Sequence, residues 1–328
     1  MNSPSSLIRA CWCLFAAGAL LAGCGQSLPG QTRSATAQAW MATGASYEDL
    51  LYVSDPGSNG VFVYWLQGRP AKLKLVGFLN AALYPRGECV DKAQNIYITD
   101  GNGPVTGLHK IFEYAHGGTT PIAALRDPAG EPNGCAVDPN TGNLAVTTSR
   151  YQHAEEIAVF TPGHAKPKLY SDNQFLGFSF CAYDDKSNLF VNGSNNSSAE
   201  FAELPAGGHK LQEITLNESF RVPGGIQWDG KHVAIGDSGA GVVYRFDISG
   251  SAGTEVGSTQ LGRTTTINQF YIEPTNFGQG SRKLIDPVML DQSGPGSVHF
   301  FDYPSGGSAT RKLPRFSTPY AVVVSASL

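Results

Sequence analysis

Polar side chains that can bind a ligand recur at one position of this chain, five residues before a repeated acidic residue. The acidic residues are Asp91, Asp138, Asp184, Asp229 and Glu273, and the residues five positions before them are Arg86, Asn133, Ser179, Gly224 and Asn268. A C-terminal segment with the same pattern adds Tyr320. Amide, hydroxyl and guanidinium groups hold small polar ligands, or a loop of a partner protein, through hydrogen bonds.

These six positions do not suit a metal ion. A hard divalent cation prefers several oxygen ligands, usually including carboxylates, and none of the six residues has one. The positive charge of Arg86 would also repel a cation. We therefore expect the site to bind no metal and no other cofactor, and we expect any charged ligand to be an anion.

Other catalytic patterns are missing from the sequence or have a simpler structural explanation. The seven histidines are dispersed without metal-ligand spacing. Residues 236–241 contain a serine among glycines, but their context predicts a hairpin between strands, not a nucleophile elbow. The repeated acidic residues precede turns rich in Asn and Gly, so we expect them to accept hydrogen bonds from turn amides. The sequence thus favours a binding site over a catalytic one.

An internal repeat positions these residues. Its acidic residues are spaced by 47, 46, 45 and 44 residues. Each copy contains four short apolar or alternating runs, which is typical of a four-stranded antiparallel blade of a β-propeller. Second strands of six such blades are predicted to begin near Leu51, Ile96, Leu144, Leu189, Val233 and Leu284. The last copy is the least regular.

The two ends of the repeat region complete each other. Residues 50–55 predict a second strand with no first strand before it, and residues 319–325 predict a first strand with no second strand after it. Together they form one blade, which closes the ring and removes the open sheet edges. Only 15% charged residues and 39 glycines also favour short strands joined by turns. We therefore predict an all-β fold, a six-bladed β-propeller of four-stranded antiparallel blades over residues 47–328.

The first 24 residues predict an export signal. Arg9 precedes an apolar run over residues 10–21 that is too short to span a bilayer as a permanent helix. The run ends in Leu21-Ala22-Gly23-Cys24, which resembles the lipobox of bacterial lipoproteins. The resemblance implies that residues 1–23 are removed and that lipid on Cys24 holds the protein at the membrane.

Alternatives to the lipobox are an ordinary secretory signal and an uncleaved apolar anchor, and each places the rest of the chain outside the cytoplasmic membrane. Gly25 stands where some Gram-negative lipoproteins have Asp, which by resemblance implies the outer membrane if the cell has one. Residues 24–46 lack apolar periodicity, so we expect a flexible tether. A net charge of −4 with dispersed Lys and Arg argues against a nucleic-acid partner.

Strand alternation predicts a disulfide between Cys89 and Cys135. Cys89 lies two residues before its acidic residue, whereas Cys135 and Cys181 lie three before theirs. Alternate residues of a strand point to opposite faces, so Cys89 and Cys135 can meet between adjacent blades, while Cys135 and Cys181 cannot. An oxidising compartment favours the bond. The alternative is three buried, reduced thiols.

The Pro-x-Gly first strands, followed by second strands of the Asn-Leu-Tyr-Val type, resemble those of NHL-repeat and gluconolactonase-like six-bladed propellers. The resemblance covers residues 47–328. In gluconolactonase-like and calcium phosphotriesterase-like propellers, Asn, Glu and Asp at the equivalent places bind a divalent metal, and Pro132-Asn133-Gly134-Cys135 is similar to one such Asn motif. The fold also serves binders and scaffolds, so it does not by itself imply catalysis.

Two functions are therefore expected. The favoured one is a non-catalytic binding or scaffold module, lipid-anchored in the cell envelope, with Arg86, Asn133, Ser179, Asn268 and Tyr320 at the mouth of the central channel as its ligand site. The alternative is a metal-dependent, lactonase-like hydrolase. In that case Asn133 and Asn268 would ligate the metal, and Asp100 or Asp237 would supply the missing carboxylate.

Overall fold

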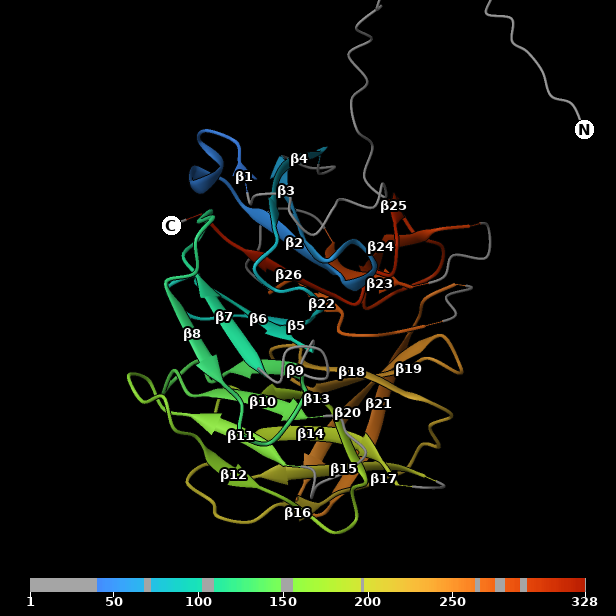
Figure 1. The fold of residues 1–328 in the computed structure, drawn as a ribbon. Helices are drawn as coiled ribbons and strands as arrows, with labels where there is room; N and C mark the ends of the chain where they lie inside the picture. Colours follow the sequence, from blue (N-terminus) through green and yellow to red (C-terminus); the bar gives the residue numbers. More distant parts are fainter. Residues whose placement is uncertain are drawn as a thin grey trace, which may run out of the picture.

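The computed structural model describes residues 40–67, 72–101, 109–148, 156–195, 198–262, 266–274, 281–289 and 294–327. Its strands form six antiparallel sheets around a common axis (Figure 1), which confirms the predicted six-bladed β-propeller. The helical elements of these residues are two short 3-10 helices, η1 (Ala45–Tyr47) and η2 (Pro56–Ser58). No helix in this part of the chain has the length and apolar character needed to cross a membrane. The predicted signal peptide and Cys24 lie outside the described residues.

Blades 2 to 6 each run along the chain from the inner to the outer strand. Blade 2 consists of β5 (Pro85–Val90), β6 (Ile96–Asp100), β7 (Lys110–Tyr114) and β8 (Ala123–Arg126). Blade 3 consists of β9 (Pro132–Val137), β10 (Leu144–Thr148), β11 (Ile157–Phe160) and β12 (Lys168–Tyr170). Blade 4 consists of β13 (Gly177–Tyr183), β14 (Leu189–Ser194), β15 (Ala199–Leu204) and β16 (Gln212–Glu213).

Blade 5 consists of β18 (Pro223–Trp228), β19 (Val233–Asp237), β20 (Val242–Ser249) and β21 (Ala252–Gln260). A short strand, β17 (Thr215–Leu216), pairs in parallel with the outer edge of β21. Blade 6 consists of β22 (Tyr271–Ile272), β23 (Arg282–Val288), β24 (Gly296–Tyr303) and β25 (Arg311–Phe316). Its inner strand is the shortest of the ring, in keeping with the irregular sixth repeat.

Blade 1 combines both ends of the described chain. It contains β2 (Leu50–Asp55), β3 (Gly60–Gln67) and β4 (Lys72–Leu79), and its inner strand is the C-terminal β26 (Ala321–Ser325). β26 pairs with β2, as the two incomplete repeats predict. A further strand, β1 (Trp40–Met41), pairs with the outer edge of β4. Residues 40–46, which the sequence assigns to the tether, therefore belong to the propeller.

Apolar side chains alternate along the strands and pack between neighbouring blades. In β2, Leu50 and Tyr52 pack against blade 2, whereas Leu51 and Val53 pack against blade 6. This two-residue period is the one that a strand buried on both faces requires. Burial of each such side chain stabilises the fold by roughly 1.5–3 kcal/mol. The core is thus a ring of six interfaces, not one central cluster.

The repeated acidic residues cap the turns that follow the inner strands, which confirms their predicted structural role. Each accepts a backbone N–H of the turn or of the next strand at 2.8–3.0 Å. The donor residues are Asn95 for Asp91, Asn140 for Asp138, Lys186 and Asn188 for Asp184, Lys231 and His232 for Asp229, and Lys283 for Glu273.

Buried polar side chains of the second strands connect consecutive blades. Thr99 of β6 donates to the carbonyl oxygen of Asn133 at 2.7 Å, and Thr147 of β10 donates to that of Ser179 at 2.9 Å. Asn192 of β14 donates to the carbonyl oxygen of Gly224 at 2.7 Å. Each bond gives an inner-strand carbonyl of the next blade a hydrogen-bond partner from a second strand. We call these three contacts the blade latches.

The side chain of Gln269, just before β22, lies at the centre of the ring. Its Nε2 donates to the carbonyl oxygens of Glu88 at 2.6 Å and Cys135 at 3.2 Å, and its Oε1 accepts the Glu88 N–H at 3.2 Å. Its backbone oxygen accepts the N–H of Val322 in β26. This residue of blade 6 therefore contacts blades 1, 2 and 3.

The structure joins Cys89 of blade 2 and Cys135 of blade 3 by a disulfide bond, with Cα atoms 5.7 Å apart. Cys181 is a buried free thiol. The inner strands approach closely enough for this bond because small residues lie between them. A Cβ atom at Gly87 would lie 2.3 Å from the carbonyl oxygen of Asn133, so only glycine fits there.

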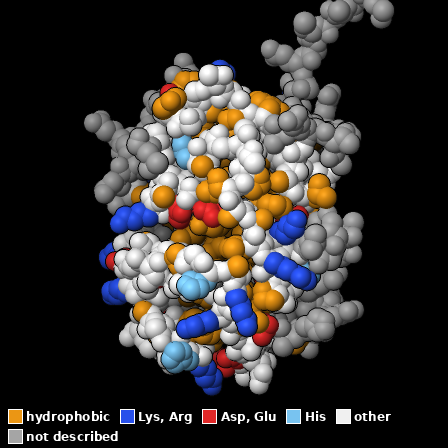
Figure 2. All heavy atoms as spheres, turned by 60° about the vertical axis from the view of Figure 1, so that its left-hand side comes forward, with side chains coloured by type: hydrophobic (Ala, Val, Ile, Leu, Met, Phe, Trp, Pro, Cys, Tyr) orange, Lys and Arg blue, Asp and Glu red, His pale blue; other side chains and the backbone are white. Residues whose placement is uncertain are grey.

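Figure 2 shows the side of the molecule on which η1 and the C-terminus lie in Figure 1. Apolar side chains are visible at the centre of this surface, next to acidic side chains and with several Lys and Arg side chains around them. The inner strands end in partly exposed Val90, Val137, Tyr183 and Trp228. The opposite end of the blades, at which the inner strands begin, is the mouth.

Candidate functional site

The mouth is defined by strand pairing. Pro85, at the start of β5, pairs with Asp100 at the end of β6, and Pro223, at the start of β18, pairs with Asp237 at the end of β19. A register shift follows each of these prolines. Such β-bulges are common where a strand re-aims its side chains beside a binding site.

The side chain of Asn133 makes hydrogen bonds to three other residues that the sequence places at the mouth. Its Oδ1 accepts a hydrogen bond from the Tyr320 hydroxyl at 2.7 Å and one from Arg86 Nη1 at 3.3 Å. Its Nδ2 donates to the carbonyl oxygen of Ser179 at 2.7 Å. Both lone pairs of the amide oxygen are therefore used by donors from blades 1 and 2.

Arg86 is a charged side chain at the mouth that is partly exposed to solvent. Its guanidinium carbon lies 5.3 Å from the ring centre of Tyr84 and 5.9 Å from that of Tyr320, distances typical of cation–π contacts. Glu131 Oε2 is 3.9 Å from Nη2, and 22% of the Arg86 side chain is exposed. Gly101 leaves room for this side chain, because a Cβ there would lie 2.5 Å from Arg86 Nε.

The electrostatics of the mouth keep Tyr320 a hydrogen-bond donor. Burial raises the pKa of its hydroxyl, and the positive charge of Arg86 and the hydrogen bond to Asn133 only partly oppose this shift. The phenol therefore stays protonated at neutral pH and donates a hydrogen bond to Asn133. Arg86 supplies a positive charge, and the carboxyl group of the buried Glu131 approaches it.

The structure brings together only part of the predicted set. Arg86, Asn133 and Tyr320 meet through their side chains, and Ser179 joins them through its backbone oxygen. Asn268 contacts the neighbouring β18 through its backbone, since its carbonyl oxygen accepts the N–H of Gly225. Its buried Nδ2 has no hydrogen-bond partner among the described residues.

Two mouth residues were missed from the sequence. Tyr84 directly precedes Pro85 and Glu131 directly precedes Pro132. The expectation that the mouth offers no carboxylate holds for the six repeat positions but not for Glu131, which approaches Arg86 from one residue outside the strand. Reading the residue before each repeat proline, as well as the residue after it, would have found both.

The two carboxylates that the hydrolase alternative would use as metal ligands accept hydrogen bonds from backbone N–H groups of the loops. Asp237 accepts the N–H groups of Arg221, Val222 and Gly239 at 2.8–3.1 Å. Asp100 accepts the N–H of Tyr84 at 3.0 Å. Among the residues that the structure describes, no group of three or more His, Cys, Asp or Glu side chains is arranged to hold a metal ion.

Ser297, His299 and Asp286 form a polar cluster inside blade 6. Ser297 Oγ lies 2.8 Å from His299 Nε2, and His299 is the cross-strand partner of Asp286. The carboxylate of Asp286 makes no hydrogen bond to the imidazole or to any other described residue. All three residues are buried, so the cluster lacks both the contact and the substrate access that a catalytic triad needs.

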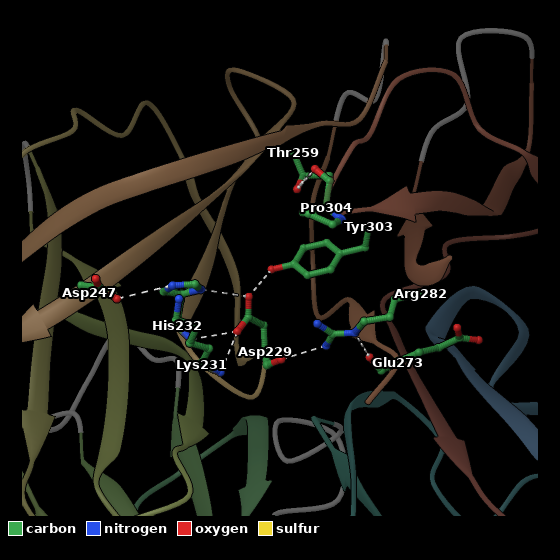
Figure 3. A network of polar contacts seen from close by, with 9 residues as sticks. All are labelled: Asp229, Lys231, His232, Asp247, Thr259, Glu273, Arg282, Tyr303 and Pro304. Atoms are coloured by element: carbon green, nitrogen blue, oxygen red, sulfur yellow. Dashed lines mark hydrogen bonds and ion pairs between the residues drawn. The ribbon is translucent and has the colours of Figure 1, made fainter. Parts of the chain in front are cut away.

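A second polar cluster connects blades 5 and 6 (Figure 3). It lies at the end opposite the mouth, because Asp229 directly follows β18 and Tyr303 is the last residue of β24. The Tyr303 hydroxyl donates to Asp229 Oδ2 at 2.6 Å, and Arg282 donates to the carbonyl oxygens of Asp229 and Glu273 at 2.8 and 2.7 Å. The Arg282 guanidinium also lies 5.1 Å from the centre of the Tyr303 ring.

This second cluster is structural. Burial acts to raise the pKa of Asp229, but the hydrogen bonds from Tyr303 and from the backbone N–H groups of His232 and Lys231 outweigh it, so the pKa is lowered. An ionised Asp229 with these donors stabilises the irregular sixth blade against its neighbour. Its groups are directed at one another, as Figure 3 shows.

Comparisons with known proteins give the fold and no family. No family model and no curated protein matches the chain. A chain in the crystal structure of a nidogen/laminin complex is similar with a TM-score of 0.65 and 15% identity, over 85% of this chain and 99% of that chain. A protein of unknown function from Bacteroides caccae has a TM-score of 0.57 and 14% identity, over 84% and 98% of the two chains.

The periplasmic gluconolactonase PpgL of Pseudomonas aeruginosa is similar as well, with a TM-score of 0.57 and 13% identity, over 85% of this chain and 99% of that chain. The neighbours thus include an enzyme and a protein crystallised in a complex with another protein. At these identities the likeness establishes the β-propeller fold alone.

Proposed function

We propose that the protein is a non-catalytic binding module of the cell envelope, whose mouth binds an anionic group of a small ligand or of a partner's loop. The observation that carries the proposal is the position of Arg86. Its guanidinium lies near two aromatic rings at the mouth and is partly exposed. A planar guanidinium held in this way suits a carboxylate or a phosphate, which it can bind through two parallel hydrogen bonds.

Asn133 argues against the hydrolase alternative. To ligate a metal ion it would have to release the hydrogen bonds from Arg86 and Tyr320, and the ion would then lie beside a guanidinium. A cation that displaces two donors and meets a positive charge is strongly disfavoured. We therefore favour binding over metal-dependent hydrolysis.

The location in the cell forms part of the proposal. The lipobox-like Leu21-Ala22-Gly23-Cys24 supports lipid attachment at Cys24 outside the cytoplasmic membrane, and at the outer membrane if the cell has one. A tether from this residue to the propeller would keep the mouth close to the membrane. Membrane-associated molecules with anionic groups are then the first ligands to consider.

Thermal unfolding in the presence of small anions tests the binding site. We expect at least one of a panel of carboxylates and phosphates to raise the Tm of the purified protein, and we expect Arg86→Gln to abolish that rise. Arg126→Gln is the matched control, since Arg126 is exposed on the outer strand of blade 2. No response to any anion contradicts the proposal, as does a calcium-dependent rise that Asn133→Ala removes.

A further inference from the structure

Three exposed apolar side chains lie next to the starts of inner strands. Tyr84, Leu176 and Val222 are 42%, 51% and 53% exposed, and each directly precedes an inner strand, in blades 2, 4 and 5. Single exposed apolar residues are common on proteins. These three lie at the same end of the inner strands of different blades, and we call them the apolar rim.

Hydrogen bonds place the apolar rim at the mouth. The carbonyl oxygen of Tyr84 accepts the N–H of Gly101, and that of Val222 accepts the N–H of Ser238. In blade 4 the direction is reversed, and the N–H of Leu176 donates to the carbonyl oxygen of Ser194. Each rim residue is therefore fixed beside the end of a second strand, at the end of its blade where the inner strand begins.

The other exposed large apolar side chains of the described residues lie elsewhere. Tyr47 and Ile122 lie near the opposite end of blades 1 and 2, where the second strands begin and the third strands end. Leu169 and Val256 lie on the outer strands of blades 3 and 5. They provide controls for any property assigned to the mouth.

Basic residues accompany the apolar rim. Arg86 stacks on Tyr84, and the exposed Arg221 directly precedes Val222. Apolar tips next to positive charges match the surface of a bilayer with anionic lipids, because the tips enter the headgroup boundary while the charges meet phosphate. The rim is therefore complementary to a lipid surface in both polarity and charge.

The described part of the chain begins near the mouth. Trp40 pairs with Phe78 near the mouth end of β4, and Ala42 donates its N–H to Val76 further down the strand. Trp40, the first described residue, thus lies near the mouth end of blade 1. The 16 residues from Cys24 to the residue before Trp40 span at most about 56 Å when fully extended.

From these observations we infer that the mouth faces the membrane that carries the lipid anchor, with Tyr84, Leu176 and Val222 in contact with the bilayer surface. This inference rests on the lipid attachment at Cys24 proposed above. The lipid on Cys24 supplies the affinity for the membrane, and the apolar rim sets the orientation of the propeller on it. The two membrane contacts thus act together. The ligand of Arg86 then reaches the mouth from the membrane surface.

Site-specific labelling tests the orientation. The full lipidated protein is reconstituted on vesicles of phosphatidylethanolamine and phosphatidylglycerol, with one spin label at Leu176→Cys, Val222→Cys, Ile122→Cys or Leu169→Cys. The native cysteines of the described residues interfere little, because Cys89 and Cys135 are bonded and Cys181 is buried. We expect vesicles to reduce the access of a water-soluble relaxation agent to positions 176 and 222 several-fold, and to leave positions 122 and 169 unchanged.

Two results overturn the inference, and they are distinguishable from a failure of the anchor. If the relaxation agent reaches positions 176 and 122 equally, or if vesicles protect position 122 instead of position 176, the mouth does not face the bilayer. The anchor is tested separately, by the mass of the mature protein and by vesicle flotation of Cys24→Ser. If Cys24 carries no lipid, the anchoring proposal fails and the orientation fails with it. If it carries lipid and the rim stays accessible, only the orientation fails.

Discussion

Asp286 occupies a position that is apolar in blades 2 to 5. The equivalent second-strand residues there are Ile98, Val146, Val191 and Ile235, and each has an apolar or aromatic partner on the third strand. Asp286 is fully buried, its partner is His299, and neither carboxylate oxygen has a hydrogen-bond partner among the described residues. Burial raises the pKa of its carboxyl well above the ordinary value.

This residue should make the stability of the protein depend on pH. Because the folded pKa is raised, the folded state holds the proton more tightly than the unfolded state. The contribution to stability is then complete below the unfolded pKa of about 3.9 and is lost as the pH rises through the folded pKa. We expect Asp286→Val to raise the free energy of unfolding by about 1–3 kcal/mol at neutral pH and by less in acid.

Urea denaturation of the wild type and Asp286→Val at acidic and neutral pH measures this difference. Glu88 also has a raised pKa because of burial, so only the difference between the two proteins is informative. Asp185→Asn is the control, since Asp185 is exposed and should change neither curve. An equal effect of Asp286→Val at both pH values would show that Asp286 is not preferentially protonated in the folded state.

At the scale of the strand, the blade latches explain why particular polar residues stand in otherwise apolar second strands. Thr147 is fully buried, donates to the carbonyl oxygen of Ser179, and accepts the N–H of Gly134 at 2.9 Å. The same hydroxyl thus joins the inner strand of its own blade to that of the next. A Val at this position would keep the shape and lose both contacts.

Removal of this hydroxyl should cost stability. We expect Thr147→Val to lower the free energy of unfolding by about 1–3 kcal/mol, because the N–H of Gly134 stays buried without a partner. Thr147→Ser keeps the hydroxyl and should recover most of the loss. Chemical denaturation of the two variants decides the matter, and a Val variant as stable as the wild type would show that the latch contributes nothing.

The strands were predictable from the sequence because each depends on neighbours within its own repeat. The alternating apolar residues, the prolines before the inner strands and the acidic residues after them give the blades and their order. The same register brought Arg86, Asn133 and Tyr320 to one mouth. Gln269 was not predictable, because its role depends on Glu88, which is 181 residues away along the chain and which no repeat pattern specifies. Asp286 was not predictable, because it replaces the apolar residue that the repeat pattern expects at its strand position.

At the scale of the whole molecule, ring closure depends on one strand. β26 is the inner strand of blade 1 and pairs with β2 over five residue pairs, from Leu50 with Ser325 to Ser54 with Ala321. Val322 and Val324 also fill the interface between blades 6 and 1. Without β26 the edge of β2 and this apolar interface would be exposed together.

Deletion of residues 319–328 should therefore abolish the cooperative unfolding transition, and a synthetic peptide of these residues added to the truncated chain should restore it. Circular dichroism during heating measures both effects. A peptide of the same composition in scrambled order is the control. A truncated chain that unfolds cooperatively near the wild-type Tm would show that closure through β26 is dispensable.

Gln269 limits how a propeller like this one can grow. Its amide spans from blade 6 to backbone groups of blades 2 and 3 with contacts of 2.6–3.2 Å. Duplication of a repeat would add a blade and widen the ring, and a side chain of fixed length would then no longer reach both partners. The Gln269 side chain reaches both partners only in a ring of this circumference. A descendant protein that keeps glutamine at this position therefore keeps six blades unless the residues at the centre of the ring also change.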